Sequence, residues 1–483
     1  MRHDSRDPSG DMSAVGRYPQ GGIRGAYAFP DVHSSRQMRE YAARSAYARR
    51  GIWQRRQSRL AILTFCLYLA TLSVDAVRKT AGLPASVVGV IYVITTILYI
   101  VAIPGAAERR RAFPQYLPIL LFFMSLWCLA AAVLQNTSPE VALLGWGSYV
   151  FFVPLLYVGA ELAADDVLLA KGLRIVVVSG GLVGVGAIAS VALGGSAPVA
   201  LQPIIPATGI HDFGDSAIYL APSFFATAEE AAEQLLIASF ACVALMRMGK
   251  GAKGRVPPAF LGILIASGLI ATARRADIYV AVAGITVVLL LGGAWAPRRR
   301  PVGRRSRLGG GVLVAIAGAV ALVPLLGGAE LVSFLTSGSA GSRVSFMFAL
   351  PGNDWLVGQG PGTATQGITA IGATAAGTGL STDGSYILNN QTYAGAEGGL
   401  SKTWLELGIM GVTLYGAIFW EALAPAMRSF RRLDGPGLAF MMLAVALGIV
   451  FLKGHQSLDD PLIQPLFWLA VGGIWGRLHA AAD

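Results

Sequence analysis

Residues 173–193 read LRIVVVSGGLVGVGAIASVAL, an apolar segment with a single charged residue, Arg174, near its start. A helix of about 20 such residues covers the roughly 30 Å hydrocarbon core of a bilayer. Similar apolar segments recur from residue 59 to the C-terminus, separated by polar stretches. A membrane β-barrel would show alternating segments of about ten residues instead. The pattern therefore predicts an all-α polytopic membrane protein.

Composition supports this class. The 483 residues are 54% hydrophobic and 13% charged, whereas soluble domains carry about 25% charged residues. A formal charge of +11 would suggest nucleic acid as the partner of a soluble protein. Here the arginines cluster beside apolar segments and act as topology signals, so no nucleic-acid partner is expected. The three cysteines, Cys66, Cys128 and Cys242, lie far apart in apolar segments and predict neither disulfides nor a metal site.

The apolar segments predict about twelve transmembrane helices. Their approximate bounds are 59–77, 83–104, 115–134, 141–162, 173–193, 231–248, 257–273, 276–295, 310–329, 404–424, 437–453 and 462–478. Residues 59–483 thus form one transmembrane domain. Residues 1–58 are rich in Arg, Ser, Gly and Tyr and predict a disordered, basic cytoplasmic tail.

Positive charge predicts the orientation of the helices. With the basic tail in the cytoplasm, four later loops carry arginine on the same side. They are the loops that contain Arg109–Arg111, Arg247–Arg255, Arg298–Arg307 and Arg428–Arg432. Both termini are then cytoplasmic. The gaps 194–230 and 330–403, which are poor in Lys and Arg, face outward.

The longer outward loop, 330–403, contains SRVSFMFALPGNDWLVGQGPG at residues 342–362. Its apolar VSFMFAL predicts a short amphipathic helix on the membrane surface, or one that packs on the bundle. The GQGPG that follows, with Gly360 at its centre, lacks the Lys-Ser/Thr of a phosphate-binding P-loop. It is compatible with a backbone nest for anions and with a tight turn.

Several cationic residues do not follow the preference of Lys and Arg for the cytoplasmic side. They are Arg274, Arg275, Arg343, Lys402, Lys453 and His455, all on the outward side of the predicted map. Charges close to a membrane segment are costly and commonly functional, although a single arginine can snorkel to lipid phosphate. Several on one face favour an anionic ligand, and guanidinium groups suit phosphate. Asp459-Asp460 alone are too little to predict a metal, so neither metal nor other cofactor is expected.

Three segments together resemble a known family. They are TARRADIYVAVAG from residue 272, GSRVSFMFALPGNDWLVGQGPGTA from residue 341, and AEGGLSKTWLELGIMGVTLY from residue 396. Their order and spacing resemble the O-antigen ligase and polysaccharide polymerase superfamily of Wzy type, over about residues 265–425. In that family a helix begins with a Ser-Arg pair on the outer face, and a long outer loop then carries an arginine and a glycine-rich turn. The match puts Arg275 and Arg343 at the two arginines, Arg274 where the serine usually stands, and Glu406 and Gly408 at the end of the last box.

The resemblance implies a GT-C-like fold with a long extracytoplasmic loop between helices 9 and 10, in the bacterial inner membrane. It implies a metal-independent glycosyltransferase that uses undecaprenyl-diphosphate-linked oligosaccharides, alongside a chain-length regulator and export proteins. Arg275 and Arg343 are then expected to stabilise the diphosphate. Glu397 is expected to act as the base, or else to cap the helix that follows. Trp355 would stack on sugars or anchor at the interface, and Arg274, Gly360, Lys402, Lys453 and His455 would line the substrate site.

Three alternatives remain at this stage. The ligase branch, which passes glycan to lipid A core or protein, has a His-Asn pair where this chain has Glu397-Gly398, so the sequence favours a polymerase of exopolysaccharide, capsule or O-antigen. A transporter or flippase for lipid-linked glycan is a different class. It would show internal repeats and charges near mid-membrane, and neither stands out here. A cell-wall glycosyltransferase related in fold is the third.

Overall fold

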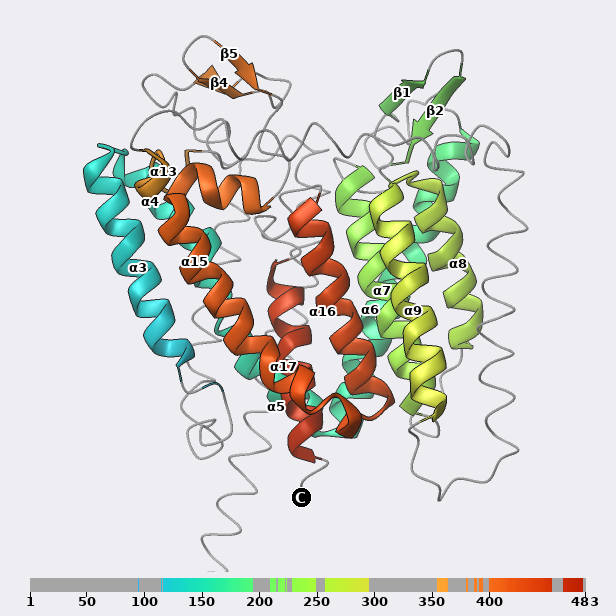
Figure 1. Cartoon of the computed structure of the whole chain (residues 1–483). Coiled ribbons are helices and arrows are strands. Elements are labelled where there is room, and N and C mark those ends of the chain that lie inside the picture. Colours follow the sequence, from blue (N-terminus) through green and yellow to red (C-terminus); the bar gives the residue numbers. More distant parts are fainter. Residues whose placement is uncertain are drawn as a thin grey trace, which may run out of the picture. The chain divides into compact units, whose positions relative to one another are not determined.

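The computed structural model of the chain is built mainly of helices (Figure 1). It describes, apart from a few single residues, the ranges 116–193, 209–213, 216–220, 228–248, 257–294, 354–363, 379–380, 386–388, 391–393, 399–453 and 464–480. The expected helices 59–77 and 310–329, nearly all of 83–104, the tail 1–58 and the VSFMFAL segment lie outside the described residues.

Long apolar helices dominate the described residues. They are α3 (Leu117–Leu134), α4 (Pro139–Trp146), α5 (Leu155–Ala164), α6 (Asp166–Ala192), α7 (Ala228–Met248), α8 (Pro258–Ala271), α9 (Arg275–Ala294), α15 (Gly399–Arg428), α16 (Gly435–Lys453) and α17 (Gln464–Ala480). Among the described residues, five helical stretches are long and apolar enough to cross a bilayer: 117–134, 139–164, 166–192, 228–248 and 402–428. Large apolar side chains such as Phe122, Leu129 and Leu182 remain exposed on them, as lipid-facing residues do. The membrane character expected from the sequence is confirmed.

In the described part of the chain, two gaps between helices contain short strands that hydropathy does not predict. Strands β1 (Gly209–Phe213) and β2 (Ser216–Leu220) form an antiparallel hairpin. Strands β3 (Gly379–Leu380), β4 (Tyr386–Leu388) and β5 (Gln391–Tyr393) form a small antiparallel sheet. The helical class expected from the sequence is therefore confirmed, and the described connections add two small sheets.

Glycines let neighbouring helices approach to backbone contact. A Cβ on Gly159 of α5 would lie 2.1 Å from the carbonyl oxygen of Leu469 in α17, and one on Gly472 would lie 1.9 Å from that of Leu156. Membrane helices use small residues in this way, because lipid offers no hydrophobic force between them and close packing must replace it. The α5–α17 pair packs closely and contributes to the larger apolar core.

The expected helix 141–162 is one span with an irregular centre. It consists of α4, a π-helical segment at Gly147–Phe151, and α5. Pro154 has no N–H to donate, and the next residues bond at i→i−3, from Leu155 N to Phe152 O and from Leu156 N to Val153 O. Because of this irregularity, the side chains of Ser148 and Tyr149 lie in other positions than they would have in a regular α-helix.

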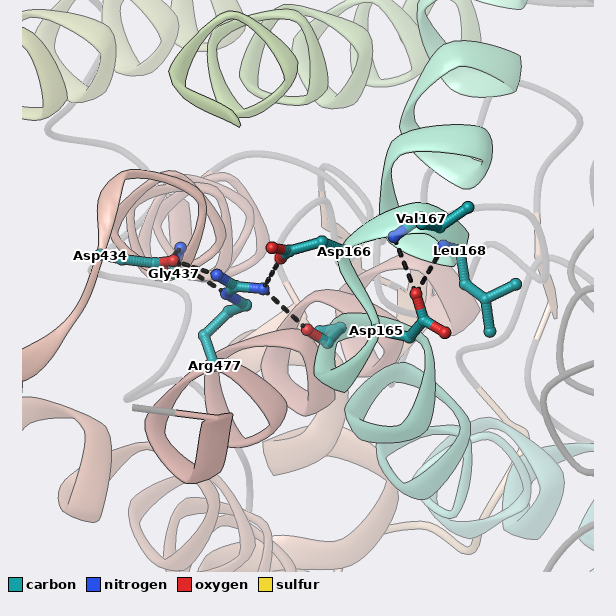
Figure 2. A network of polar contacts seen from close by, with 8 residues as sticks. Asp165, Asp166, Val167, Leu168, Asp434, Gly437 and Arg477 are labelled. Atoms are coloured by element: carbon teal, nitrogen blue, oxygen red, sulfur yellow. Dashed lines mark hydrogen bonds and ion pairs between the residues drawn. The ribbon is translucent and has the colours of Figure 1, made fainter. Parts of the chain in front are cut away.

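At the end of α17 nearer the C-terminus, one arginine joins three segments (Figure 2). Arg477 Nε donates to Asp434 Oδ2 at 2.9 Å, and Arg477 Nη1 donates to Ala163 O at 3.2 Å and pairs with Asp166 Oδ1. A second guanidinium nitrogen also pairs with Asp434. Asp165 caps α6 by accepting from the amides of Val167 and Leu168. We call Arg477, Asp434, Asp166 and Ala163 the arginine clamp.

Candidate functional site

A glycine kink interrupts α15 early in the helix. Gly408 has φ 62° and ψ −163°, a conformation that is essentially restricted to glycine. Because a helical carbonyl normally accepts from the N–H four residues later, a break here frees the carbonyls just before Gly408. Three of them find new donors: Leu405 O accepts from Gln359 N at 2.7 Å, Glu406 O from Gly360 N at 3.0 Å, and Leu407 O from Trp127 Nε1 at 2.9 Å. Each of these three carbonyls at the kink is therefore hydrogen-bonded.

The turn that supplies two of these donors is GQGPG, residues 358–362, which we call the docked turn. It follows the short helix α13 (Asp354–Val357). Gly358, Gly360 and Gly362 have φ of +76°, +103° and +86°. A Cβ on Gly358 would lie 2.5 Å from the Glu406 carbonyl oxygen, and one on Gly362 would lie 2.1 Å from that of Val141. The two hypotheses for this motif are a backbone nest for anions and a tight turn, and the structure shows the tight turn. Two of its amides, those of Gln359 and Gly360, donate to carbonyls of α15.

Beside the kink lies a buried polar network. Lys402 Nζ and Glu406 Oε2 are 3.8 Å apart one turn along α15, with side-chain exposures of 1% and 0%. Tyr149 donates its hydroxyl to Glu406 Oε2 at 2.9 Å. Lys402 Nζ lies 3.1 Å from Ser148 Oγ and 5.0 Å from the centre of the Tyr149 ring. Buried charges need such polar partners, because removing one ion from water otherwise costs roughly several kcal/mol.

The network extends to α17. Gln464, its first residue, is fully buried and donates its Nε2 to Ser148 O. Tyr149 and Ser148 come from the π-helical segment, and π-helical insertions in α-helices are frequent at functional sites. We call Lys402, Glu406, Tyr149, Ser148 and Gln464 the lysine network.

Sequence analysis missed most of this network. Tyr149, Ser148 and Gln464 carry no motif, and their partners lie hundreds of positions away. One local signal was present, the spacing of four between Lys402 and Glu406, which places both on one helix face. Lys402 is one of the predicted substrate-binding residues, and the structure places its side chain in the protein interior.

A second polar cluster lies where α7, α8 and α9 meet. Arg274 Nη1 pairs with Glu229 Oε1 at 2.6 Å, both partly exposed. Asp277, on the first turn of α9, is buried. Ala273, which directly precedes Arg274, has φ +55°, so the α8–α9 connection is a tight reversal. Arg274 is therefore engaged by a carboxylate. Its neighbour Arg275 begins α9, and the structure describes its backbone only.

The remaining expected site residues are distributed as follows. Trp355 is half exposed on α13, and Gly360 is buried in the docked turn. Lys453 ends α16, with its backbone alone described. Arg343, Glu397 and His455 lie outside the described residues. Gly360 and Lys402 are thus linked through Glu406, whose carbonyl accepts from Gly360 N and whose carboxylate pairs with Lys402. Arg274 belongs instead to the second polar cluster, where α7, α8 and α9 meet.

In the part of the chain that the structure describes, no three His, Cys, Asp or Glu side chains come together to hold a metal ion. Cys128 and Cys242 are buried there as free thiols.

No protein-family model matches this chain, and no curated protein matches it. The resemblance drawn from the three segments therefore rests on those segments alone.

Proposed function

We propose that the protein is a membrane glycosyltransferase that polymerises oligosaccharide repeat units carried on a polyprenyl diphosphate, outside the cytoplasmic membrane. In this proposal the donor glycan moves from its lipid diphosphate to a hydroxyl of a second glycan. The product is an exopolysaccharide, capsule or O-antigen, and both chain termini lie in the cytoplasm.

The observation that carries the proposal is the contact between two of the three motif segments. GQGPG and LSKTWLELGIMG are separated in sequence, yet the amides of Gln359 and Gly360 bond to the carbonyls of Leu405 and Glu406. Gly408, at the end of the last motif, has the conformation that makes these carbonyls available. A resemblance made of unrelated fragments would give no reason for such a junction.

The distribution of arginine supports the proposed orientation. Arg477 pairs with Asp434, next to the start of α16, and a Cβ on Gly435 would lie 2.7 Å from Cβ of Arg247. The ends of α7, α16 and α17 that meet here therefore carry the basic residues, which favours the cytoplasm. The docked turn packs near the opposite end of the helices, at the start of α15, and would face outward.

The proposed chemistry needs a base and positive charge. The acceptor hydroxyl attacks the anomeric carbon of the donor, and its proton passes to Glu397. The bond from that carbon to the diphosphate oxygen breaks, and the lipid diphosphate leaves with the electron pair. Arg275 and Arg343 stabilise the charge that develops on it. Because Arg274 is already paired with Glu229 at 2.6 Å, we assign this role to Arg275 and not to its neighbour.

The test uses purified protein in liposomes with a polyprenyl-diphosphate-linked repeat unit, and product ladders are read by gel. Arg275→Ala and Arg343→Ala should each lower the rate about 100-fold or more. Arg→Lys should still impair transfer, because it keeps the charge and loses the fork. Glu397→Gln should abolish ladders while donor binding persists, since it removes basicity and keeps shape. Thr413→Ala, on an exposed position of α15, serves as the matched control.

Normal ladders from both alanine variants would reject the phosphate role of the arginines. Reporter fusions give an independent check on orientation: positions 205 and 365 should be exported, and positions 302 and 430 should remain cytoplasmic. A cytoplasmic signal at 365 would exclude the proposed site.

A further inference from the structure

The buried ion pair of α15 is poorly explained by stability. Lys402 and Glu406 are removed from water, and apolar residues of similar volume commonly stabilise such positions equally well or better. Their order along the helix, cation first, is also the weaker arrangement of an i,i+4 pair. A functional contribution accounts better for two charges at this place.

The position of the lysine network indicates what that contribution is. Three segments that adjoin the predicted outward connections meet there. The start of α15 follows the loop that contains Glu397 and brings in Lys402. The docked turn reaches the same helix through Gly360 N and Glu406 O, at 3.0 Å. The start of α17 contributes Gln464, whose amide bonds to Ser148 O.

Lys402 is not available to a substrate in this arrangement. Its ammonium is occupied by Ser148 Oγ at 3.1 Å, the Tyr149 ring at 5.0 Å and Glu406 at 3.8 Å. An effect of Lys402 on the reaction would have to pass through these neighbours.

We propose that Lys402 and Glu406 are positioning residues for the transfer step. Their ion pair fixes the first turns of α15 against the π-helical segment and the docked turn, and α15 follows directly in sequence on the segment that contains Glu397. This inference rests on the proposed function. Since a displacement of about 1 Å can cost on the order of 100-fold in rate, a small rotation of this turn would suffice to impair transfer.

The decisive variant is the double substitution Lys402→Met with Glu406→Leu, which removes both charges and leaves neither buried alone. Three quantities are measured: the unfolding temperature in detergent, amide hydrogen exchange of 354–363 and 399–407, and kcat and KM for the lipid-linked donor. We expect an unfolding temperature close to that of the unchanged protein and exchange at least about tenfold faster in both segments. We expect kcat to fall about 10- to 100-fold, with KM changed less than about twofold. Thr413→Ala should change none of them.

Two outcomes would overturn the proposal. Unchanged exchange and unchanged kcat in the stable double variant would show a pair that only packs. A raised KM with unchanged kcat would show that Lys402 binds the donor. If the unchanged protein transfers no glycan, the proposed function fails, and the exchange measurement alone still decides whether the pair fixes these segments.

A second variant covers the case in which the double variant does not fold. Tyr149→Phe removes only the hydroxyl that is donated to Glu406 Oε2 at 2.9 Å. It should accelerate exchange of 399–407 and lower kcat about three- to tenfold, a change equivalent to one ordinary hydrogen bond. Exchange and kcat both equal to those of the unchanged protein would again reject the positioning role.

Discussion

The lysine network and the arginine clamp both include α17, one at each end, and each contains a cation paired with a carboxylate. They differ in their access to water. Lys402 and Glu406 have side-chain exposures of 1% and 0%, whereas those of Arg477, Asp166 and Asp434 are 13%, 72% and 37%. When a clamp contact breaks, its carboxylates can turn to solvent. In the network a charge that loses its partner stays buried, so the loss of one partner should cost little at the clamp and much in the network.

The two cations also differ in geometry. Arg477 spreads its bonds over two carboxylates and the carbonyl of Ala163, which a planar guanidinium allows. Lys402 is a point charge held by a hydroxyl, an aromatic face and one carboxylate. The clamp therefore ties helix ends together over a broad area, and the network fixes a single turn of α15.

The largest effect should follow a change at the kink that supports the network. Gly408→Ala would put a Cβ 2.4 Å from the carbonyl oxygen of Leu356, on a backbone with positive φ. Strain, overpacking and the loss of two docked-turn hydrogen bonds together should cost about 5 kcal/mol or more. The measurement is thermal unfolding in detergent. Gly416→Ala, in the same helix with nothing within 4 Å of the new Cβ, is the control and should be neutral or stabilising by up to about 1 kcal/mol. Equal stability of the two variants would show that the kink is unimportant.

The next largest effect should come from half of the buried pair. Lys402→Met alone leaves the buried Glu406 without its cation, and should lower the free energy of unfolding by about 3–5 kcal/mol. Adding Glu406→Leu should recover most of this loss. A single variant as stable as the double one would mean that Glu406 does not need Lys402, and the contrast with the clamp would disappear.

A smaller loss is expected from the clamp. Arg477→Met removes charge-assisted hydrogen bonds to partly exposed carboxylates and should cost about 2 kcal/mol. Raising the salt concentration should reduce the difference between this variant and the unchanged protein, since exposed pairs are screened. The effect of Lys402→Met should not respond to salt. Identical salt responses at the two ends would contradict the comparison.

The smallest effect should come from one neutral hydrogen bond near the kink. Trp127→Phe removes the donor to Leu407 O, 2.9 Å away, and keeps most of the ring. It should cost about 1 kcal/mol. A loss as large as that of Lys402→Met would show that the carbonyls freed by the kink matter more than the buried charges.

Much of the helical layout could be predicted locally. The expected segments 115–134, 231–248 and 437–453 correspond to α3, α7 and α16 within a few residues, because apolar runs of spanning length have few other stable forms in lipid. The irregular centre of the expected helix 141–162 could not be predicted in detail. Pro154 signals a break, but the π-helical segment depends on packing around Tyr149, which is buried against Tyr415 and bonded to Glu406.

The environment of the charges was the least predictable part of the candidate site. Arg274 and Lys402 resemble each other in sequence as cations near helix starts. Arg274 lies partly exposed beside Glu229, and Lys402 is buried against Ser148, which lies 254 positions away in the chain. Hydropathy averages over neighbours in sequence and contains no information on which distant segment covers a side chain.

By itself the sequence determined the membrane class, the approximate helices and the need for a special backbone at GQGPG, since these follow from local polarity and from glycine chemistry. Only the tertiary structure decided that the docked turn completes the kink at Gly408, that Lys402 is buried against Tyr149, and that Arg477 joins three helix ends. The physical reason is common to all three. Hydrogen bonds and ion pairs act over a few ångströms in space, and the partners that satisfy a freed carbonyl or a buried charge are chosen by the folding of the whole chain.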